Sequence, residues 1–266
     1  MKNKFSNEFI FQIAALLLAV IVVHTIYVGL IRPNAEAILA QQAALEAAGA
    51  DYSPSRSLYV VLKDFEQETC FILMIWAVAI MGYKARSILE DRSMLDQEFL
   101  QVSAGISILP EDAREYSRGL QALPDNERSS LLPRALLKAL QRFGSTQSIQ
   151  DASSTVRETC DSEAERLESE LSMIRYIAWA IPSIGFIGTV RGIGTALGQA
   201  HKAVEGDIAG VTAALGVAFN STFVALVISI LVMFLMYQLQ LLQERLVLDS
   251  QDYCESRLLA HLRVNR

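Results

Sequence analysis

Two threonines and a serine interrupt the longest apolar stretches of this chain. Thr189 lies within the apolar run 176–200, and Thr222 and Ser229 lie within the run 208–243. In hydrocarbon a hydroxyl can orient water or solvate a cation, because it both donates and accepts hydrogen bonds. It can equally bond the carbonyl four residues earlier in its own helix and have no further role. From the residues alone, an ion path and simple helix packing both stay open for these side chains.

The two apolar runs are each long enough to cross a bilayer as a helix. A span needs about 20 apolar residues, because a helix rises ~1.5 Å per residue. Arg191 is the single charged residue inside either run, and the polar turn 201–207 separates them. The pattern predicts a transmembrane helical hairpin.

Small residues and hydroxyls share one face of each predicted helix, at about 100° per residue. Such faces let helices approach closely, and Gly188 with Gly192, like Gly194 with Gly198, forms a GxxxG motif. The first face holds Pro182, Gly185, Phe186, Thr189, Ile193 and Ala196, and the second holds Leu215, Ala218, Thr222, Ala225 and Ser229. As pore-lining or packing residues we expect Pro182, Gly185, Gly188, Gly192, Ala218 and Ala225.

The segment Pro182–Ile193, PSIGFIGTVRGI, closely resembles the signature P-x-x-G-x-x-G-T-V-x-G-I of the MotA/TolQ/ExbB proton channel family. The second run contains ALGVAFNSTFVALVIS, which is similar to the last helix of that family and places Thr222 on its motif threonine. The resemblance implies that Thr189, Thr222 and Ser229 lie along the path of H⁺ or Na⁺. The chain departs from the pattern at Arg191, where many relatives have Trp, and at Val217, where ExbB-like members have a membrane-embedded Glu.

The resemblance also implies partners and a mode of action. Five copies are expected to surround the single helices of a dimeric partner of the MotB/TolR/ExbD type, whose transmembrane Asp carries the ion. Since Val217 cannot ionise, the partner's acid becomes essential. The chain would be the ion-conducting ring subunit of a stator-like motor that converts ion-motive force into mechanical work. The alternative is a membrane scaffold that anchors a cytoplasmic helical domain without ion transport. A secondary transporter is disfavoured, because no pair of inverted repeats is visible.

Composition agrees with a membrane protein and argues against other classes. The chain is 52% hydrophobic with mean hydropathy +0.30, as expected of an integral membrane protein. Its net charge of −6 offers no basic face for nucleic acid. No nucleophile–base pair or carboxylate dyad suggests an enzyme, and no cofactor is expected apart from the transported ion. Cys70, Cys160 and Cys254 lack metal-site spacing, and no disulfide is expected.

We predict an all-α fold with four transmembrane helices, two of which extend into a cytoplasmic helical domain. The run 69–83 is short for a span, so a re-entrant or interfacial segment is the alternative there. The predicted division is 1–31, N-terminus and first transmembrane helix; 32–68, periplasmic loop; 69–83, second helix; 84–175, cytoplasmic helical region; 176–243, channel hairpin; and 244–266, cytoplasmic tail.

Basic residues set the expected orientation. Positive charge near membrane helices favours the cytoplasmic side, and the flanking basic residues are Lys2, Lys4, Lys84, Arg86, Arg92, Arg166, Arg175 and Arg245. Both termini are therefore predicted to be cytoplasmic, in a bacterial inner membrane.

Three polar residues inside the spans are assigned structural roles. Arg191 is about 200° around its helix from Thr189, so it should not face the same path. In the outer part of the bilayer it is expected to snorkel to the headgroups or to pair with an acid such as Asp207 or Glu68. Asn220 is expected to bond a neighbouring helix, and His24 to be a neutral histidine bonded to a neighbour near the outer end of its helix.

Overall fold

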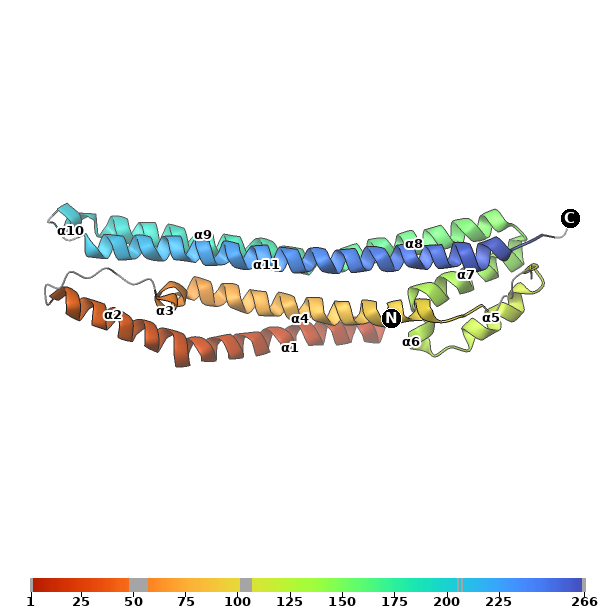
Figure 1. Cartoon of the computed structure of the whole chain (residues 1–266), viewed down its shortest axis with the longest axis horizontal. Helices are drawn as coiled ribbons and strands as arrows, with labels where there is room; N and C mark the ends of the chain where they lie inside the picture. Colours follow the sequence, from red (N-terminus) through yellow and green to blue (C-terminus); the bar gives the residue numbers. More distant parts are fainter. Residues whose placement is uncertain (1, 48–56, 101–106, 205, 207, 265–266) are drawn as a thin grey trace. The chain divides into compact units, whose positions relative to one another are not determined.

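The computed structural model describes residues 2–47, 57–100, 107–204, 206 and 208–264, and those residues are mostly helical (Figure 1). Four of its helices are long and apolar enough to cross a membrane: Asn7–Leu45, Phe65–Asp96, Ile149–Gly198 and Ala209–His261. These observations confirm the prediction of an all-α polytopic membrane protein. The chain divides into two compact units, one formed by Met1–Met81 and Met173–Met236 and the other by Gly82–Ser172 and Tyr237–Arg266.

The first unit pairs the N-terminal helices with the predicted hairpin. It contains α1 (Lys2–Ile26), η1 (Tyr27–Ile31), α2 (Arg32–Ala47), α3 (Leu58–Leu62), most of α9 (Ser172–Gly198), α10 (Ala200–Val204) and parts of α4 (Phe65–Ser93) and α11 (Ala209–Tyr253). α1 lies beside α4, where the Trp76 indole N–H donates to the Gln12 carbonyl at 2.9 Å. α9 lies beside α11 (Figure 1).

Helix extends further on both sides of the first loop than the sequence predicts. Residues 32–47 lie in the predicted loop, yet they form α2 after η1. This stretch is rich in Ala, and its Gln and Glu residues are also good helix formers. η1 is a π-turn in which the Arg32 N–H bonds the Tyr27 carbonyl five residues earlier. Pro33, which has no N–H to donate, follows Arg32. The short run 69–83 lies inside the 29-residue helix α4.

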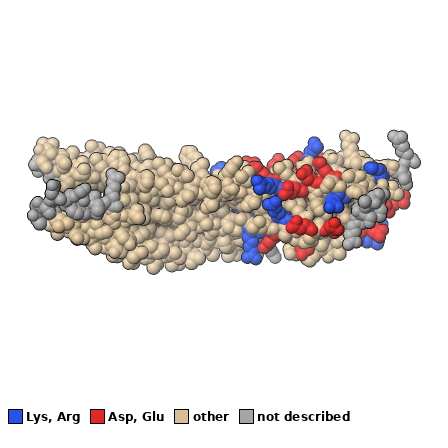
Figure 2. All heavy atoms as spheres, viewed as in Figure 1, with Lys and Arg blue, Asp and Glu red and all other residues tan. Residues whose placement is uncertain are grey.

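The second unit is a small helical domain with its own core. It contains η2 (Met94–Asp96), α5 (Ala113–Gln121), α6 (Asp125–Arg128), α7 (Leu131–Thr146), α8 (Ile149–Glu170), η3 (Cys254–Leu258), η4 (Leu259–His261) and the remaining parts of α4 and α11. One apolar face of α7 packs against α8 and the C-terminal segment, and the fully buried residues include Leu136, Leu140, Phe143, Ala152, Cys160 and Leu258. In Figure 2, charged side chains crowd over this unit, whereas almost none show on the visible face of the first unit.

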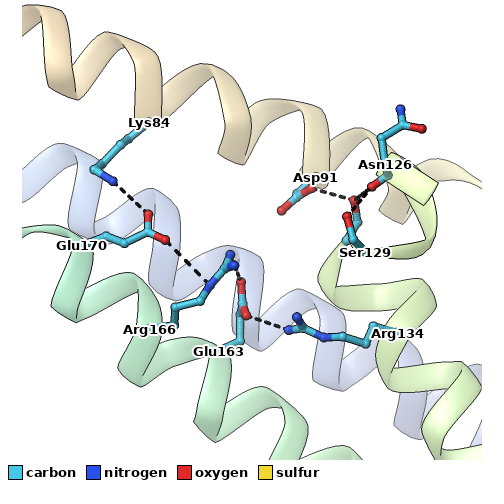
Figure 3. A network of polar contacts seen from close by, with 9 residues as sticks. Lys84, Asp91, Asn126, Ser129, Arg134, Glu163, Arg166 and Glu170 are labelled. Carbon is cyan, nitrogen blue, oxygen red and sulfur yellow. Dashed lines mark hydrogen bonds and ion pairs between the residues drawn. The ribbon is translucent and has the colours of Figure 1, made fainter. Parts of the chain in front are cut away.

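A row of ion pairs joins three helices inside the second unit (Figure 3). Lys84 of α4 contacts Glu170 of α8 at 3.0 Å. Glu163 of α8 accepts from both Arg134 of α7 and Arg166 of its own helix, each at 2.6 Å. Because the Glu163 side chain is only 4% exposed, its carboxylate depends on these two arginines for the hydrogen bonds that water would otherwise provide.

Glu163→Gln is expected to lower the melting temperature of the detergent-solubilised protein. The amide keeps the shape of the side chain but weakens two charge-assisted hydrogen bonds, at a cost of about 1–3 kcal/mol in the free energy of unfolding. Glu158→Gln on the exposed face of the same helix is the matched control. Equal melting temperatures for the two variants would show that the Glu163 ion pairs do not stabilise this unit.

Candidate functional site

The two threonines of the hairpin face one another across the seam between α9 and α11. The Thr189 and Thr222 hydroxyls are hydrogen-bonded to each other, and both side chains are half-buried. Thr189 also reaches the Ala218 carbonyl of the opposite helix at 3.1 Å, and Thr222 reaches the Gly185 carbonyl at 3.2 Å. The helical period places each threonine on a face of its own helix that carries small residues, and in the structure these two hydroxyls meet.

Glycines allow the close approach that brings the hydroxyls together. A Cβ on Gly192 would lie 2.8 Å from both the Ala214 carbonyl oxygen and the Ala218 nitrogen. A Cβ on Gly188 would lie 2.6 Å from the Ser221 hydroxyl oxygen. Gly185, Ala218 and Ala225 also meet in this seam, because the space that a Gly185 Cβ would need is taken by α11. The second GxxxG motif differs, since a Cβ on Gly194 or Gly198 would meet nothing within 4 Å among the described residues.

Pro182 and Ser229 form a complementary pair. A proline within a helix cannot donate to the carbonyl four residues earlier, which here belongs to Ala178. The buried Ser229 hydroxyl, from α11, donates to that carbonyl at 3.2 Å. In lipid an unsatisfied carbonyl is costly, so Ser229 replaces the backbone N–H that Pro182 lacks. The hydroxyl proton of Ser229 is used in this bond.

Not every residue of the predicted faces lies in the seam. Phe186 and Ile193 are 65% and 42% exposed, because the seam follows Gly185, Gly188, Gly192 and Ala196 instead. Asn220 is half-buried, and its side chain has no hydrogen bond among the described residues. Its expected bond to a neighbouring helix therefore stays a prediction.

Arg191 forms the principal ion pair of the hairpin, with a partner that the sequence does not reveal. Its Nε and Nη2 atoms contact the two carboxylate oxygens of Glu66, each at 2.8 Å. Glu66 lies in the first turn of α4 and is 9% exposed. The expected partner Glu68 is bonded elsewhere, and Asp207 lies outside the described residues. The Nη2 atom of Arg191 also lies 3.9 Å from Asp64, immediately before α4.

Glu68 instead joins α4 to the first helix. Its carboxylate forms an ion pair with Arg32, and one oxygen lies 2.7 Å from His24 Nδ1. The π-turn makes this possible, because it stacks residues five apart and so places the Arg32 guanidinium 5.7 Å from the centre of the Tyr27 ring. His24 thus has the bonded neighbour that the sequence analysis expects.

Glu66 and Arg32 are functional candidates that the residue pattern did not single out. The apolar run 69–83 is too short to span a membrane alone, and its short length is the feature of the sequence that could have indicated Glu66. A longer helix must include Glu66 and Glu68, which then lie in its first turn, where carboxylates are favourable near the positive end of the helix dipole.

Comparison with known proteins identifies the class. The fold is that of an all-helical polytopic membrane protein whose last two spans enclose a pair of hydroxyls. Residues 127–252, which cover α7 to most of α11, match the model of the MotA/TolQ/ExbB proton channel family, so this part of the chain is a domain of that family. The chain matches no curated protein and no solved structure.

The match of this domain carries a general function with it. It supports an ion-driven energiser or stator-type role in a membrane, which is not an enzyme class. It also supports a partner with a single membrane span.

Proposed function

We propose that this chain is the ion-conducting ring subunit of a stator-like membrane motor, carrying H⁺ or Na⁺. The observation that carries the proposal is the Thr189–Thr222 pair, two half-buried hydroxyls held in the seam of the family's own hairpin. Each hydroxyl also has a backbone carbonyl within reach. Rotation of the side chain alone therefore exchanges a partner within the chain for a water or an ion, without moving either helix.

The ring is proposed to be a homopentamer in a bacterial inner membrane, with both termini in the cytoplasm. At its centre stands a dimeric single-span partner of the MotB/TolR/ExbD type, which supplies a transmembrane Asp. Large apolar side chains on the outer faces of the hairpin support assembly with lipid and other helices, since Phe186, Phe219 and Phe223 are each at least 65% exposed in the single chain. Each elementary charge that crosses releases ~2.3 kcal/mol per 100 mV for mechanical work.

Thr189→Val and Thr222→Val test the proposal, because valine keeps the shape and removes the hydroxyl. Losing a hydrogen bond to a charged species costs about 1.5–3 kcal/mol, so each variant should lower ion uptake roughly 10- to 100-fold. Uptake is measured in right-side-out membrane vesicles from the native host under an imposed potential, with H⁺- and Na⁺-sensitive dyes. The native mass of the purified complex shows whether assembly persists.

Thr195→Val is the matched control, because this exposed threonine of α9 bonds only the Arg191 carbonyl of its own helix among the described residues. Unchanged uptake in all three variants, with intact assembly, would leave the scaffold function as the better account. One observation favours that alternative: the two hydroxyls already satisfy one another within the chain.

A further inference from the structure

A buried carboxylate stands behind the hydroxyl pair, on a helix outside the hairpin. Glu66 of α4 is 9% exposed, and its Cγ lies 3.1 Å from the position that a Cβ on Gly188 would occupy. The Ser221 hydroxyl oxygen lies 2.6 Å from the same position. Gly188 and Ser221 are the chain neighbours of Thr189 and Thr222. Glu66 therefore reaches the hairpin at the level of the two threonines.

Glu66 lies close to Val217, the position on α11 at which ExbB-like proteins have an acid. Ser221 donates its hydroxyl to the Val217 carbonyl at 2.9 Å, which places Val217 one turn before Ser221. Gln67, next to Glu66, is fully buried, and its Nε2 donates to the Val61 carbonyl at 3.0 Å and reaches the Ser221 hydroxyl at 3.4 Å, while its Oε1 is buried without a hydrogen-bond partner among the described residues. A buried acceptor left open in this way suits a water molecule or a protonated carboxyl group.

Arg191 has a second carboxylate within reach. It binds both oxygens of Glu66, and its Nη2 atom lies 3.9 Å from Asp64 Oδ1, while Asp64 Oδ2 is buried without a hydrogen-bond partner. The arginine side chain is 49% exposed, so close packing does not enclose it on all sides. Burial raises the pKa of Asp64, and the nearby positive charges of Lys63 and Arg191 oppose that shift. Asp64 is thus a carboxylate that would gain from a closer cation.

We propose that Glu66 takes up and releases the transported ion as a proton, and that Arg191 moves from Glu66 to Asp64 whenever Glu66 is protonated. This rests on the proposed function and narrows the ion to H⁺. On uptake, a proton from the outer aqueous side binds a carboxylate oxygen of Glu66, and the guanidinium pairs with ionised Asp64. On release the proton passes from Glu66 to the transmembrane Asp of the proposed partner, and the guanidinium returns to Glu66. Glu66 thus supplies within the chain the ionisable group that Val217 does not.

The geometry favours a proton over a metal cation. A single carboxylate can hold a proton, whereas a hard cation needs several oxygen ligands. The described residues contain no group of three or more His, Cys, Asp or Glu side chains able to hold a metal ion. Both oxygens of Glu66 already face a guanidinium, which repels a second fixed cation. Among the described residues, the charged or titratable groups around Glu66 and Asp64 are Arg191 of α9, Arg32 of α2, Tyr27 of η1, Cys70 of α4 and Lys63.

Infrared spectroscopy of the purified full-length protein in lipid detects the proton directly. The difference between spectra at low and neutral pH should contain a protonated-carboxyl band that Glu66→Gln removes. Glu68→Gln is the matched control, because that carboxylate is equally buried in the same helical turn but pairs with Arg32 and His24. A band that survives in Glu66→Gln and disappears in Glu68→Gln overturns the proposal.

Proton uptake in native vesicles separates a proton carrier from a structural ion pair. Glu66→Gln should lower uptake at least tenfold, and the conservative variant Glu66→Asp should recover part of it. The double variant Glu66→Gln/Arg191→Gln removes the uncompensated arginine. It should remain as slow as the single variant, and recovery to wild-type uptake would show that Glu66 only neutralises Arg191.

The two proposals fail in distinguishable ways. If the threonine variants lose uptake while Glu66→Gln keeps it, or while the double variant recovers it, this inference fails and the channel assignment stands. If the threonine variants keep full uptake, the channel assignment fails first. Glu66→Asp and the double variant keep the test decisive if Glu66→Gln does not assemble.

Discussion

Replacing Gly192 by alanine is expected to destabilise the hairpin, whereas the same replacement at Gly194 is expected to be neutral or stabilising. A Cβ at residue 192 would lie 2.8 Å from two backbone atoms of α11, which cannot move aside as a flexible side chain can. Overpacking of this kind costs about 1–3 kcal/mol. A Cβ at residue 194 would meet no described residue within 4 Å, so alanine brings only its higher helix propensity, worth up to ~1 kcal/mol.

The measurement is the melting temperature of each purified variant in detergent, together with ion uptake in vesicles. Gly192→Ala should also lose uptake, because separating α9 from α11 parts the two hydroxyls at residues 189 and 222. The two variants share a helix, a residue type and a substitution, and they differ only in their surroundings. Equal melting temperatures would mean that α9 and α11 do not approach as closely as described.

Phe143→Ala is expected to have the largest effect on the second unit. Phe143 is fully buried among α7, α8 and the C-terminal segment, and truncating a buried phenylalanine costs about 3–5 kcal/mol in the free energy of unfolding. Hydrogen exchange of the full-length protein should then show faster exchange throughout α7 and α8.

Leu248→Ala provides the control for Phe143→Ala. It also deletes apolar atoms from this unit, but its side chain is 60% exposed, so little buried surface is lost. Exchange in α7 and α8 should match the wild type. If Phe143→Ala exchanged no faster than this control, the helices of the second unit would not depend on the core assigned to them.

The hairpin was predictable because its signals are local. Apolar length predicts the spans, and a 3.6-residue period places Thr189 and Thr222 on faces that meet. Periodicity fixes a face only within about 100°. Periodicity therefore also assigns Phe186 and Ile193 to this face, although both are exposed because the seam follows the glycines at 188 and 192.

The ionic contacts of α4 were not predictable, since they depend on how helices distant in sequence align. Arg191 pairs with Glu66, whereas Glu68, one of the acids that the sequence analysis considers for it, pairs with Arg32. A shift of two residues along α4 decides between these partners, and neither composition nor spacing specifies it. The role of Ser229 likewise becomes visible only when the carbonyl freed by Pro182 is seen beside it.

The π-turn at Tyr27–Ile31 makes the first helix sensitive to residue count rather than to residue identity. Losing one residue there would restore an ordinary helical repeat and rotate everything from Arg32 to Ala47 by about 100° relative to the preceding turns. Arg32 would then swing away from Glu68 and from the Tyr27 ring together. Val28 and Leu30 point outward, so their substitution removes little buried surface. It also leaves the number of residues in the π-turn unchanged. No side-chain substitution can restore the rotation that an insertion or deletion there would change. Variants of this segment should therefore tolerate changes of residue type but not changes of length.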